Sequence, residues 1–243
     1  MVNADDFGYS AGVNLGIIAA HQEGIVTSTT MMMNMPGVQH AFKLARENPE
    51  LGVGIHLVLT CNKPLSNDVF SLVNEEGNFH SLQEIHQHAN MEDVKREFTK
   101  QVEAFLESGQ KPTHIDSHHH VHANENILPV VIELAEQYQL PIRHFRTLQN
   151  EHVNLGEIIT TDACNADFYG NDLSVETIEK IIDSYDVDIL EIMTHPAYID
   201  QSLYQGSRYS LQRMKELDIL TDPRVKEMLM ARNIQLITFK HLG

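Results

Sequence analysis

The sequence predicts an α/β protein in which mostly parallel strands alternate with helices. Strand-like and helix-like segments follow one another along the 243 residues, which is the pattern of βα units. Several of the apolar, strand-like runs end directly in aspartate or histidine. Because about seven strands can be counted, a closed or distorted (β/α) barrel is favoured over a doubly wound sheet.

The N-terminal half begins with short strands that helices separate. Apolar or Thr- and Met-rich runs predict strands at residues 1–5, 26–33 and 51–59. Apolar residues at helical spacing predict helices at 11–22, 38–47, 82–88 and 91–108. Ser10 is a plausible N-cap for the first helix and Gly24 its stop. Residues 61–80 contain turn residues and little periodicity, which indicates a loop.

The C-terminal half continues the same alternation. Apolar runs predict strands at residues 114–117, 142–146, 187–194 and 234–239. Helical spacing predicts helices at 126–138, 174–185, 211–217 and 222–231. Since no internal repeat, low-complexity tract or linker is visible, we expect one domain over residues 1–243.

The composition disfavours several classes of partner. Acidic residues outnumber basic ones 34 to 17, for a formal charge of -17, whereas nucleic acids and anionic membranes require clustered Lys and Arg. Apolar runs fall far short of the ~20 residues that a membrane span needs. No signal peptide is visible, and Val2 and Asn3 look like the end of a strand that begins before Met1.

The two cysteines indicate a reducing compartment. Cys61 and Cys164 are too few for a disulfide framework, and neither belongs to a CxxC pair. We therefore expect reduced thiols in the cytoplasm and no thiolate zinc site. A homodimer is the default expectation for the assembly.

Polar clusters stand at the ends of four predicted strands. Their sequences are NADD, GIH, HIDSHHHVH and MTHP. Barrels and open parallel sheets both place their active sites at the carboxyl ends of the strands. The four clusters are therefore expected to share one rim.

The first cluster contains two adjacent carboxylates, Asp5 and Asp6. Neighbouring residues of a strand point in opposite directions, but where a strand leads into a loop both can reach one pocket. One carboxylate could then bind a metal while the other moves a proton. Taken alone, the pair fits a turn or a helix cap better.

The third cluster holds five histidines within nine residues, which favours a metal-binding or catalytic role. His118 and His122 are four residues apart and could share one helical face. Alternatively, one histidine binds the metal while the others orient ligands or bind substrate. His114 and His120, taken singly, fit packing or surface positions.

His56 in GIHL and His195 in MTHP are lone histidines at strand exits. A lone histidine is usually a packed or surface residue, but both positions face the same rim as Asp6 and His118. Two histidines and one aspartate suit a catalytic Mg²⁺, Zn²⁺ or Mn²⁺.

Such a metal site polarises a carbonyl and activates water. A carboxylate nearby can act as base and an imidazole can protonate a leaving amine, so amide hydrolysis is favoured. The sequence has no GxGxxG, Walker or GxSxG motif. Hydrolysis of another amide or of a phosphate ester is the alternative. A non-catalytic sugar- or metal-binding protein is disfavoured, because a binder does not need Asp5 beside Asp6.

The motifs together resemble the YdjC-like carbohydrate deacetylase family, whose best-known activity is on chito-oligosaccharides. The matching motifs occur in order along the chain: NADDFGYS, GIVTSTTMMMN, GIHLVLT, PTHIDSHHHVH and MTHPA. The match runs from Asn3 to Thr221, and HIDSHHHVH combined with NADDFG is the specific part. Members of the family usually carry a few more apolar residues before NADD than this chain does.

The resemblance implies a distorted TIM-like barrel that removes acetyl groups from sugars containing N-acetylglucosamine, such as diacetylchitobiose. It implies a divalent metal, Mg²⁺ first and Zn²⁺ second. By motif match, the metal ligands are Asp6, His56 and His118. Asp5 corresponds to the general base, and His195 to the acid or to the group that orients the acetyl oxygen. The residues that line or support the site are His119, His122 and Arg143.

Overall fold

The computed structural model describes residues 1–144 and 155–242. In this part of the chain, strands hydrogen-bond in the order β4-β3-β2-β1-β6-β5. The strands are β1 (Val2–Phe7), β2 (Ser28–Met31), β3 (Gly52–Leu57), β4 (Ile115–Ser117), β5 (Ala163–Asn165) and β6 (Leu190–Thr194). The pairings of β1 with β2 and β6, of β3 with β4 and of β5 with β6 are parallel, as expected.

The chain divides into two compact units. The first comprises residues 1–31, 36–53 and 161–243, and the second comprises residues 32–35 and 54–160. A single domain over residues 1–243 stays a prediction.

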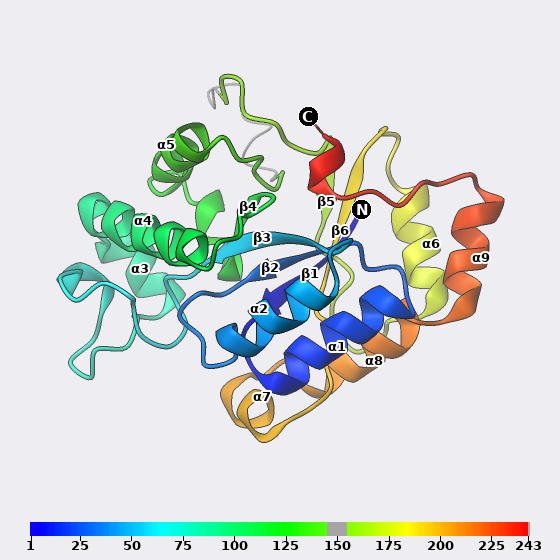
Figure 1. Ribbon diagram of the computed structural model, residues 1–243, viewed down its shortest axis with the longest axis horizontal. Helices are drawn as coiled ribbons and strands as arrows, with labels where there is room; N and C mark the ends of the chain where they lie inside the picture. The colour runs from blue at the N-terminus through cyan, green and yellow to red at the C-terminus, as the bar shows by residue number, and fades with distance from the viewer. Residues whose placement is uncertain (145–154, 243) are drawn as a thin grey trace. The chain divides into compact units, whose positions relative to one another are not determined.

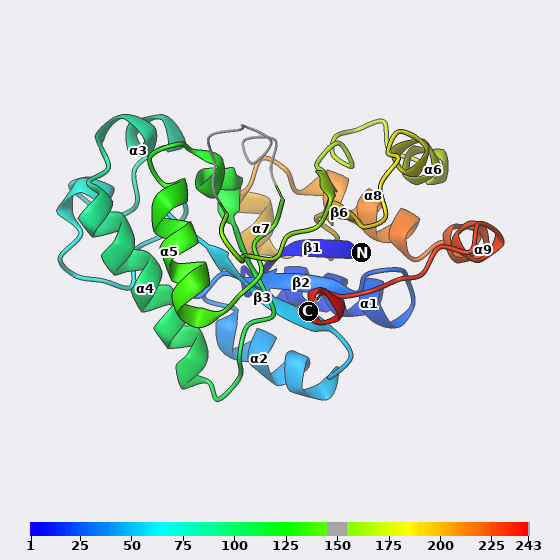
Figure 2. The ribbon, with the colours of Figure 1, turned by 90° about the horizontal axis from the view of Figure 1, so that it is seen from above.

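In the first unit, helices pack around β1, β2, β6 and β5. They are α1 (Ala11–Gln22), α2 (Val38–Glu47), α6 (Val175–Asp183), α7 (Gln201–Gly206), α8 (Leu211–Leu220) and α9 (Pro223–Ala231). Helix α1 contacts α2 and α8, and α6 lies beside α9 (Figures 1 and 2). Ser10 caps α1 by accepting the Val13 N–H, and the helix ends at the C-cap Glu23 with Gly24 directly after it, both as expected.

In the second unit, the end of β3 and β4 lie with α3 (Leu82–His88), α4 (Met91–Glu107) and α5 (Leu128–Tyr138). Helix α4 holds the segment after β3 through buried polar side chains. Gln101 accepts the Val58 N–H and donates to the Val58 carbonyl, and Glu97 accepts the N–H groups of Leu65 and Ser66. Burial raises the pKa of the Glu97 carboxyl, although these hydrogen bonds oppose the shift.

Two predicted strands differ in the structure. Residues 234–238 are not a strand, and Phe239–His241 forms a 3-10 turn that Thr238 caps. The Ile237 carbonyl accepts the Thr27 hydroxyl instead of joining a ladder. Of residues 142–146, Ile142 makes an isolated parallel bridge to Ile115, while 145 and 146 lie outside the described residues.

In the described part of the chain, one strand and one α-helix were not predicted, because both are too short to show periodicity. These are β5, with three residues, and α7, with six. The loop expected at 61–80 contains one 3-10 turn, Phe70–Leu72, and one isolated bridge between Val73 and Phe79. Every helix among the described residues is too short or too polar to cross a lipid bilayer.

Helix α1 packs closely on the segment that follows β6. A Cβ atom added at Gly16 would lie 2.4 Å from the Cα of Ala197, two residues after His195. Replacing glycine by alanine in a helix interior typically raises the free energy of unfolding by about 0.5–1 kcal/mol. Forcing extra atoms into a packed core typically lowers it by about 1–3 kcal/mol. The backbone of Ala197 cannot move aside as a flexible side chain would, so the clash outweighs the gain.

We therefore expect Gly16→Ala to lower the thermal midpoint, by about 2–4 °C per kcal/mol lost. Thermal denaturation followed by circular dichroism measures the change. Leu15→Ala is the matched control, because Leu15 is the exposed neighbour on the same helix. A Gly16→Ala variant as stable as the wild type would contradict the close packing.

Candidate active site

A bulge near the end of β1 presents the two adjacent carboxylates. Ala4 pairs with Thr29 and Phe7 with Met31, so Asp5 and Asp6 together stand opposite one residue of β2. Asp6 has a left-handed backbone with φ of 71°, which is uncommon for a residue other than glycine. Both carboxylates are buried. Such strain gathers at functional sites, and here it breaks the strand alternation that would separate the pair.

Asn3 orients Asp5. The Asn3 Nδ2 donates to Asp5 Oδ1 at 2.8 Å and to Thr30 Oγ1 at 3.3 Å. One buried amide thus links the Asp5 carboxylate to both β1 and β2. Sequence reasoning gave Asn3 no role, because an asparagine within a strand carries no signal of its own.

Arg213 of α8 compensates the buried charge of Asp6. Its Nη2 lies 2.6 Å from Asp6 Oδ2, and its Nε donates to the Tyr209 carbonyl at 2.8 Å. Its Nη1 is buried with no hydrogen-bond partner among the described residues. A buried ion pair needs such good geometry to offset the desolvation of both charges. Sequence reasoning missed Arg213, because a helical arginine far along the chain looks like an ordinary surface residue.

Glu216, one turn further along α8, anchors the backbone at His195. The Glu216 carboxylate accepts the His195 backbone N–H and the Tyr209 hydroxyl, the latter at 2.5 Å. His195 Nδ1 lies 4.0 Å from Glu216 Oε1. Burial, with a smaller contribution from Asp5, raises the pKa of Glu216 to about 7, although these hydrogen bonds and Arg213 oppose the shift. Burial and the nearby Glu216 likewise raise the pKa of Tyr209.

In the second unit, a buried carboxylate links His56 to Arg143. His56 Nδ1 lies 2.7 Å from Asp116 Oδ1, and Arg143 Nη1 lies 2.8 Å from Asp116 Oδ2. All three side chains are buried. A metal-binding histidine typically donates its second ring N–H to a carboxylate in this way. In this arrangement His56 Nδ1–H donates to Asp116 Oδ1, and the lone pair of His56 Nε2 is left for a metal.

The histidine cluster forms a distorted 3-10 turn, His118–Ala123. His119 and His120 have left-handed backbones, so His118 and His122 do not share a helical face, contrary to one of the two expectations. The His118 ring lies 5.6 Å from the His56 ring and 4.0 Å from the His119 ring, between centroids. His122 is buried and bonds to Ser117, both through Nδ1 and through its backbone N–H.

The remaining histidines of the cluster differ in exposure. His119 is exposed, and its Nδ1 lies 2.8 Å from the Thr60 hydroxyl. His114 is buried, and a Cβ added at Gly54 would meet its ring at 2.4 Å. His114 is therefore a packed residue, as expected.

Among the residues that the structure describes, two groups of side chains could hold a metal ion. Asp6, His56 and His118 form one group, and Asp5, His56 and Asp116 form the other. In each, one ligand atom per residue lies within 4.8 Å of the others. One carboxylate oxygen with two imidazole nitrogens suits a catalytic divalent metal. The first group fits better, because both oxygens of Asp116 already contact His56 and Arg143.

The fold and these side chains define a class of α/β protein with a candidate Asp/His metal site. The model of the YdjC-like protein family matches residues 1–231, and the chain belongs to this family. It is 51% identical over 247 residues to a carbohydrate deacetylase of Brevibacillus brevis, covering 100% of this chain and 99% of the relative. It is 41% identical over 249 residues to a chitooligosaccharide deacetylase of Proteus mirabilis, covering 100% and 98%.

Solved structures agree with this fold. A crystal structure from Enterococcus faecalis, provisionally described as a cellobiose-phosphate cleavage protein, matches with a TM-score of 0.94 and 39% identity, covering 100% of this chain and 98% of that one. A family 4 carbohydrate esterase from Streptomyces lividans, in complex with acetate, has a TM-score of 0.52 at 12% identity, covering 99% and 93%. The second likeness shows a shared fold only, and it confirms the distorted (β/α) barrel class.

The raised pKa of Glu216 predicts a pH-dependent stability. Its folded pKa of about 7 exceeds its usual value of 4.5, so the folded state binds the proton more tightly. The contribution of Glu216 to the free energy of unfolding is therefore most favourable below about pH 4.5 and is lost as the pH rises through about 7.

Glu216→Gln cannot ionise and removes this dependence. We expect the free energy of unfolding of the wild type, minus that of Glu216→Gln, to fall between about pH 5 and about pH 8. Urea denaturation across this range measures the difference. The exposed Glu227 gives the matched control, Glu227→Gln. A constant difference across the range would show that Glu216 is already ionised in the folded state.

Proposed function

We propose that the chain hydrolyses the acetamide group of N-acetylated sugars such as chito-oligosaccharides and releases acetate. Family membership and its named relatives identify it as an enzyme, a carbohydrate deacetylase. The observation that carries the proposal for this site is the group Asp6, His56 and His118, with Asp5 beside Asp6 on the β1 bulge.

We propose that Asp6, His56 and His118 bind one divalent metal, Mg²⁺ first and Zn²⁺ as the alternative. The donor set supports this proposal, and so does the orientation of His56 by Asp116. When bound, the ion supplies the Lewis acidity that polarises the acetamide carbonyl and lowers the pKa of water. Arg213 neutralises one oxygen of Asp6 and leaves the other for a ligand role.

Asp5 is the proposed general base and His195 the proposed general acid. Asp5 takes a proton from water as the water oxygen bonds to the acetyl carbon. The C–N bond then breaks as the sugar nitrogen receives a proton from His195, which leaves acetate and a free amine. Asn3 supports Asp5 from one side, and Glu216 fixes the backbone of His195. Placed groups of this kind each contribute about 10²–10⁴-fold to the rate.

The other proposed site residues have supporting roles. Arg143 holds Asp116, which in turn orients His56. His122 fixes the turn that carries His118 through its bonds to Ser117. His119 is exposed beside His118 and is proposed to contact substrate.

We also propose a cytoplasmic location; two cysteines in 243 residues, neither in a CxxC pair, are typical of a protein from a reducing compartment. The homodimer expected by default stays a prediction. Hydrolysis of another amide or of a phosphate ester remains the alternative activity, and a parallel dye-based phosphatase assay separates it from deacetylation.

The proposed metal dependence predicts loss and recovery of activity. Protein stripped with a chelator should release no acetate from N,N′-diacetylchitobiose, because the carbonyl is no longer polarised. Separate addition of Mg²⁺, Zn²⁺, Mn²⁺ or Co²⁺ should restore release with at least one ion. Unchanged release after stripping, with metal content verified as absent, would refute the metal-dependent mechanism.

Asp5 and His118 should separate catalysis from metal binding. Asp5→Asn should keep the metal but lose turnover by about 10²–10⁴-fold, because the amide cannot accept the proton. His118→Ala should lose the metal itself. Metal content after dialysis and acetate release measure both effects. The exposed Asp186 and His88 give the controls Asp186→Asn and His88→Ala; near-normal activity in both site variants would refute these assignments.

A further inference from the structure

An exposed tyrosine lies beside His195. Tyr169 belongs to the loop between β5 and α6, at the carboxyl end of β5, and 51% of it is exposed. Its ring stacks on the Tyr209 ring with centroids 3.8 Å apart and an angle of 12°. The His195 ring meets the edge of this stack, 5.7 Å from Tyr169 and 5.8 Å from Tyr209. Tyr209 therefore covers one face of Tyr169.

The loop that carries Tyr169 is fastened to α8 and to Tyr209. The Gly170 N–H donates to the Tyr209 hydroxyl at 2.9 Å. Lys215 Nζ donates to the Asn171 carbonyl at 2.7 Å, and Gln212 Nε2 donates to Asn171 Oδ1 at 3.0 Å. A large aromatic ring is thus held in place without being buried. A ring that is already ordered loses little conformational entropy when a ligand packs on it.

The hydroxyl of Tyr169 lies within the electrostatic field of Arg213, Glu216 and Asp6. Burial of its polar end raises the pKa of Tyr169; Arg213 opposes the shift, and Glu216 and Asp6 add to it. Like an ordinary tyrosine, Tyr169 is uncharged at neutral pH, and the shift is in the direction that keeps it so. An uncharged aromatic face beside the proposed acid suits a neutral ligand with an apolar side.

We propose that Tyr169 is a stacking platform for a pyranose ring of the N-acetylated sugar, a role that rests on the proposed deacetylase function. A glucosamine-type ring carries its substituents equatorially and therefore presents flat C–H faces. Packing such a face on Tyr169 removes apolar surface from water. The platform would hold the sugar beside His195, the proposed donor to its nitrogen.

Steady-state kinetics with N,N′-diacetylchitobiose test the platform. Tyr169→Ala should raise KM about tenfold while kcat changes less than about twofold, because stacking binds substrate and transition state alike. Tyr169→Phe keeps the ring and should behave like the wild type. Tyr204→Ala removes another exposed tyrosine, on α7, and is the matched control.

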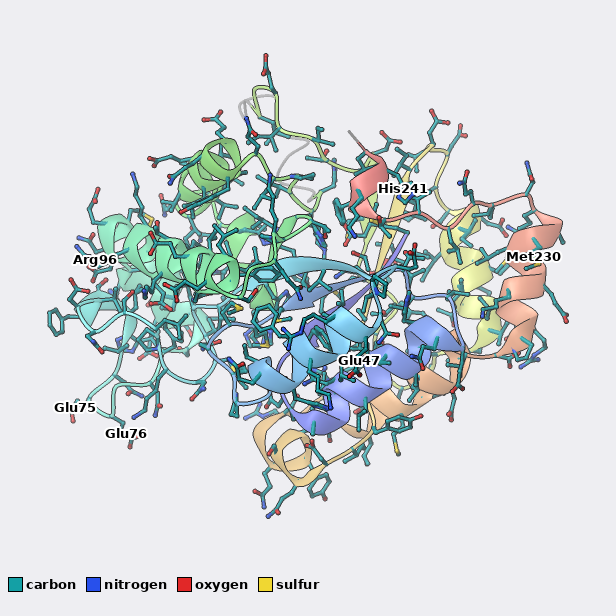
Figure 3. The ribbon with its side chains drawn as sticks, in the orientation of Figure 1. Glu47, Glu75, Glu76, Arg96, Met230 and His241 are labelled. Atoms are coloured by element: carbon teal, nitrogen blue, oxygen red, sulfur yellow. The ribbon has the colours of Figure 1, made fainter. Side chains whose placement is uncertain are left out.

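A direct binding readout is available because the chain contains no tryptophan. Tyr169→Trp, combined with Asp5→Asn to suppress turnover, places a single tryptophan on the platform, and excitation at about 295 nm would select it over the tyrosines. Titration with diacetylchitobiose should give a saturable fluorescence change, and titration with acetate should give none. Met230→Trp in the same background is the control. Met230 is exposed on α9, at the surface of the first unit (Figure 3).

The outcomes separate this inference from the proposed function. A KM effect confined to Tyr169→Ala, with a fluorescence change confined to Tyr169→Trp, supports the platform. Acetate release by the wild type, with unchanged KM in Tyr169→Ala and no change in Tyr169→Trp, overturns the platform and leaves the function standing. Absence of acetate release from the wild type overturns the proposed function. In that case a saturable fluorescence change in Tyr169→Trp would still support sugar stacking on Tyr169, and no fluorescence change would overturn the platform as well.

Discussion

The buried ion pair between Asp6 and Arg213 is the constraint on which the first unit's half of the site depends. Arg213 Nη2 and Asp6 Oδ2 are 2.6 Å apart, and two opposite charges this close can remain buried together. Burying either charge alone would cost several kcal/mol of desolvation free energy. Breaking a buried pair by removing one partner typically costs about 3–5 kcal/mol. Arg213 therefore fixes α8 against the β1 bulge. The same helix then carries Glu216 to the backbone of His195 and supports the loop of Tyr169.

The second unit also contains a buried arginine–aspartate ion pair. Arg143 neutralises Asp116 within a buried site, and Asp116 can then hold one nitrogen of His56. In both units a buried arginine stabilises an aspartate that either binds the metal in the proposed site or orients a residue that does. Full burial removes the freedom of these side chains, so the groups proposed for chemistry are ordered before substrate arrives. Such prior ordering is the usual source of electrostatic catalysis.

Much of the fold could be predicted from local sequence, because strands and helices of ordinary length show their period. The ranges of α1, α2 and α3 match the structure. The prediction of a strand at 234–239 was wrong. A run of apolar residues does not reveal whether a neighbouring strand is present to form backbone hydrogen bonds with it. β5 was missed since three residues contain less than two periods of a strand, and α7 since six residues contain less than two turns of a helix.

The sequence by itself determined which residue types meet at the carboxyl ends of the strands. NADD, GIH, HIDSHHHVH and MTHP are local patterns, and they sufficed to nominate Asp5, Asp6, His56, His118 and His195. Only the tertiary structure decided what supports them. Arg213 lies 207 residues from Asp6 along the chain, Asp116 lies 60 from His56, and Glu216 lies 21 from His195. Those pairings arise from folding in three dimensions. Arg213 and Glu216 belong to no local pattern that marks them, and Asp116, although it lies within HIDSHHHVH, has no local signal that pairs it with His56.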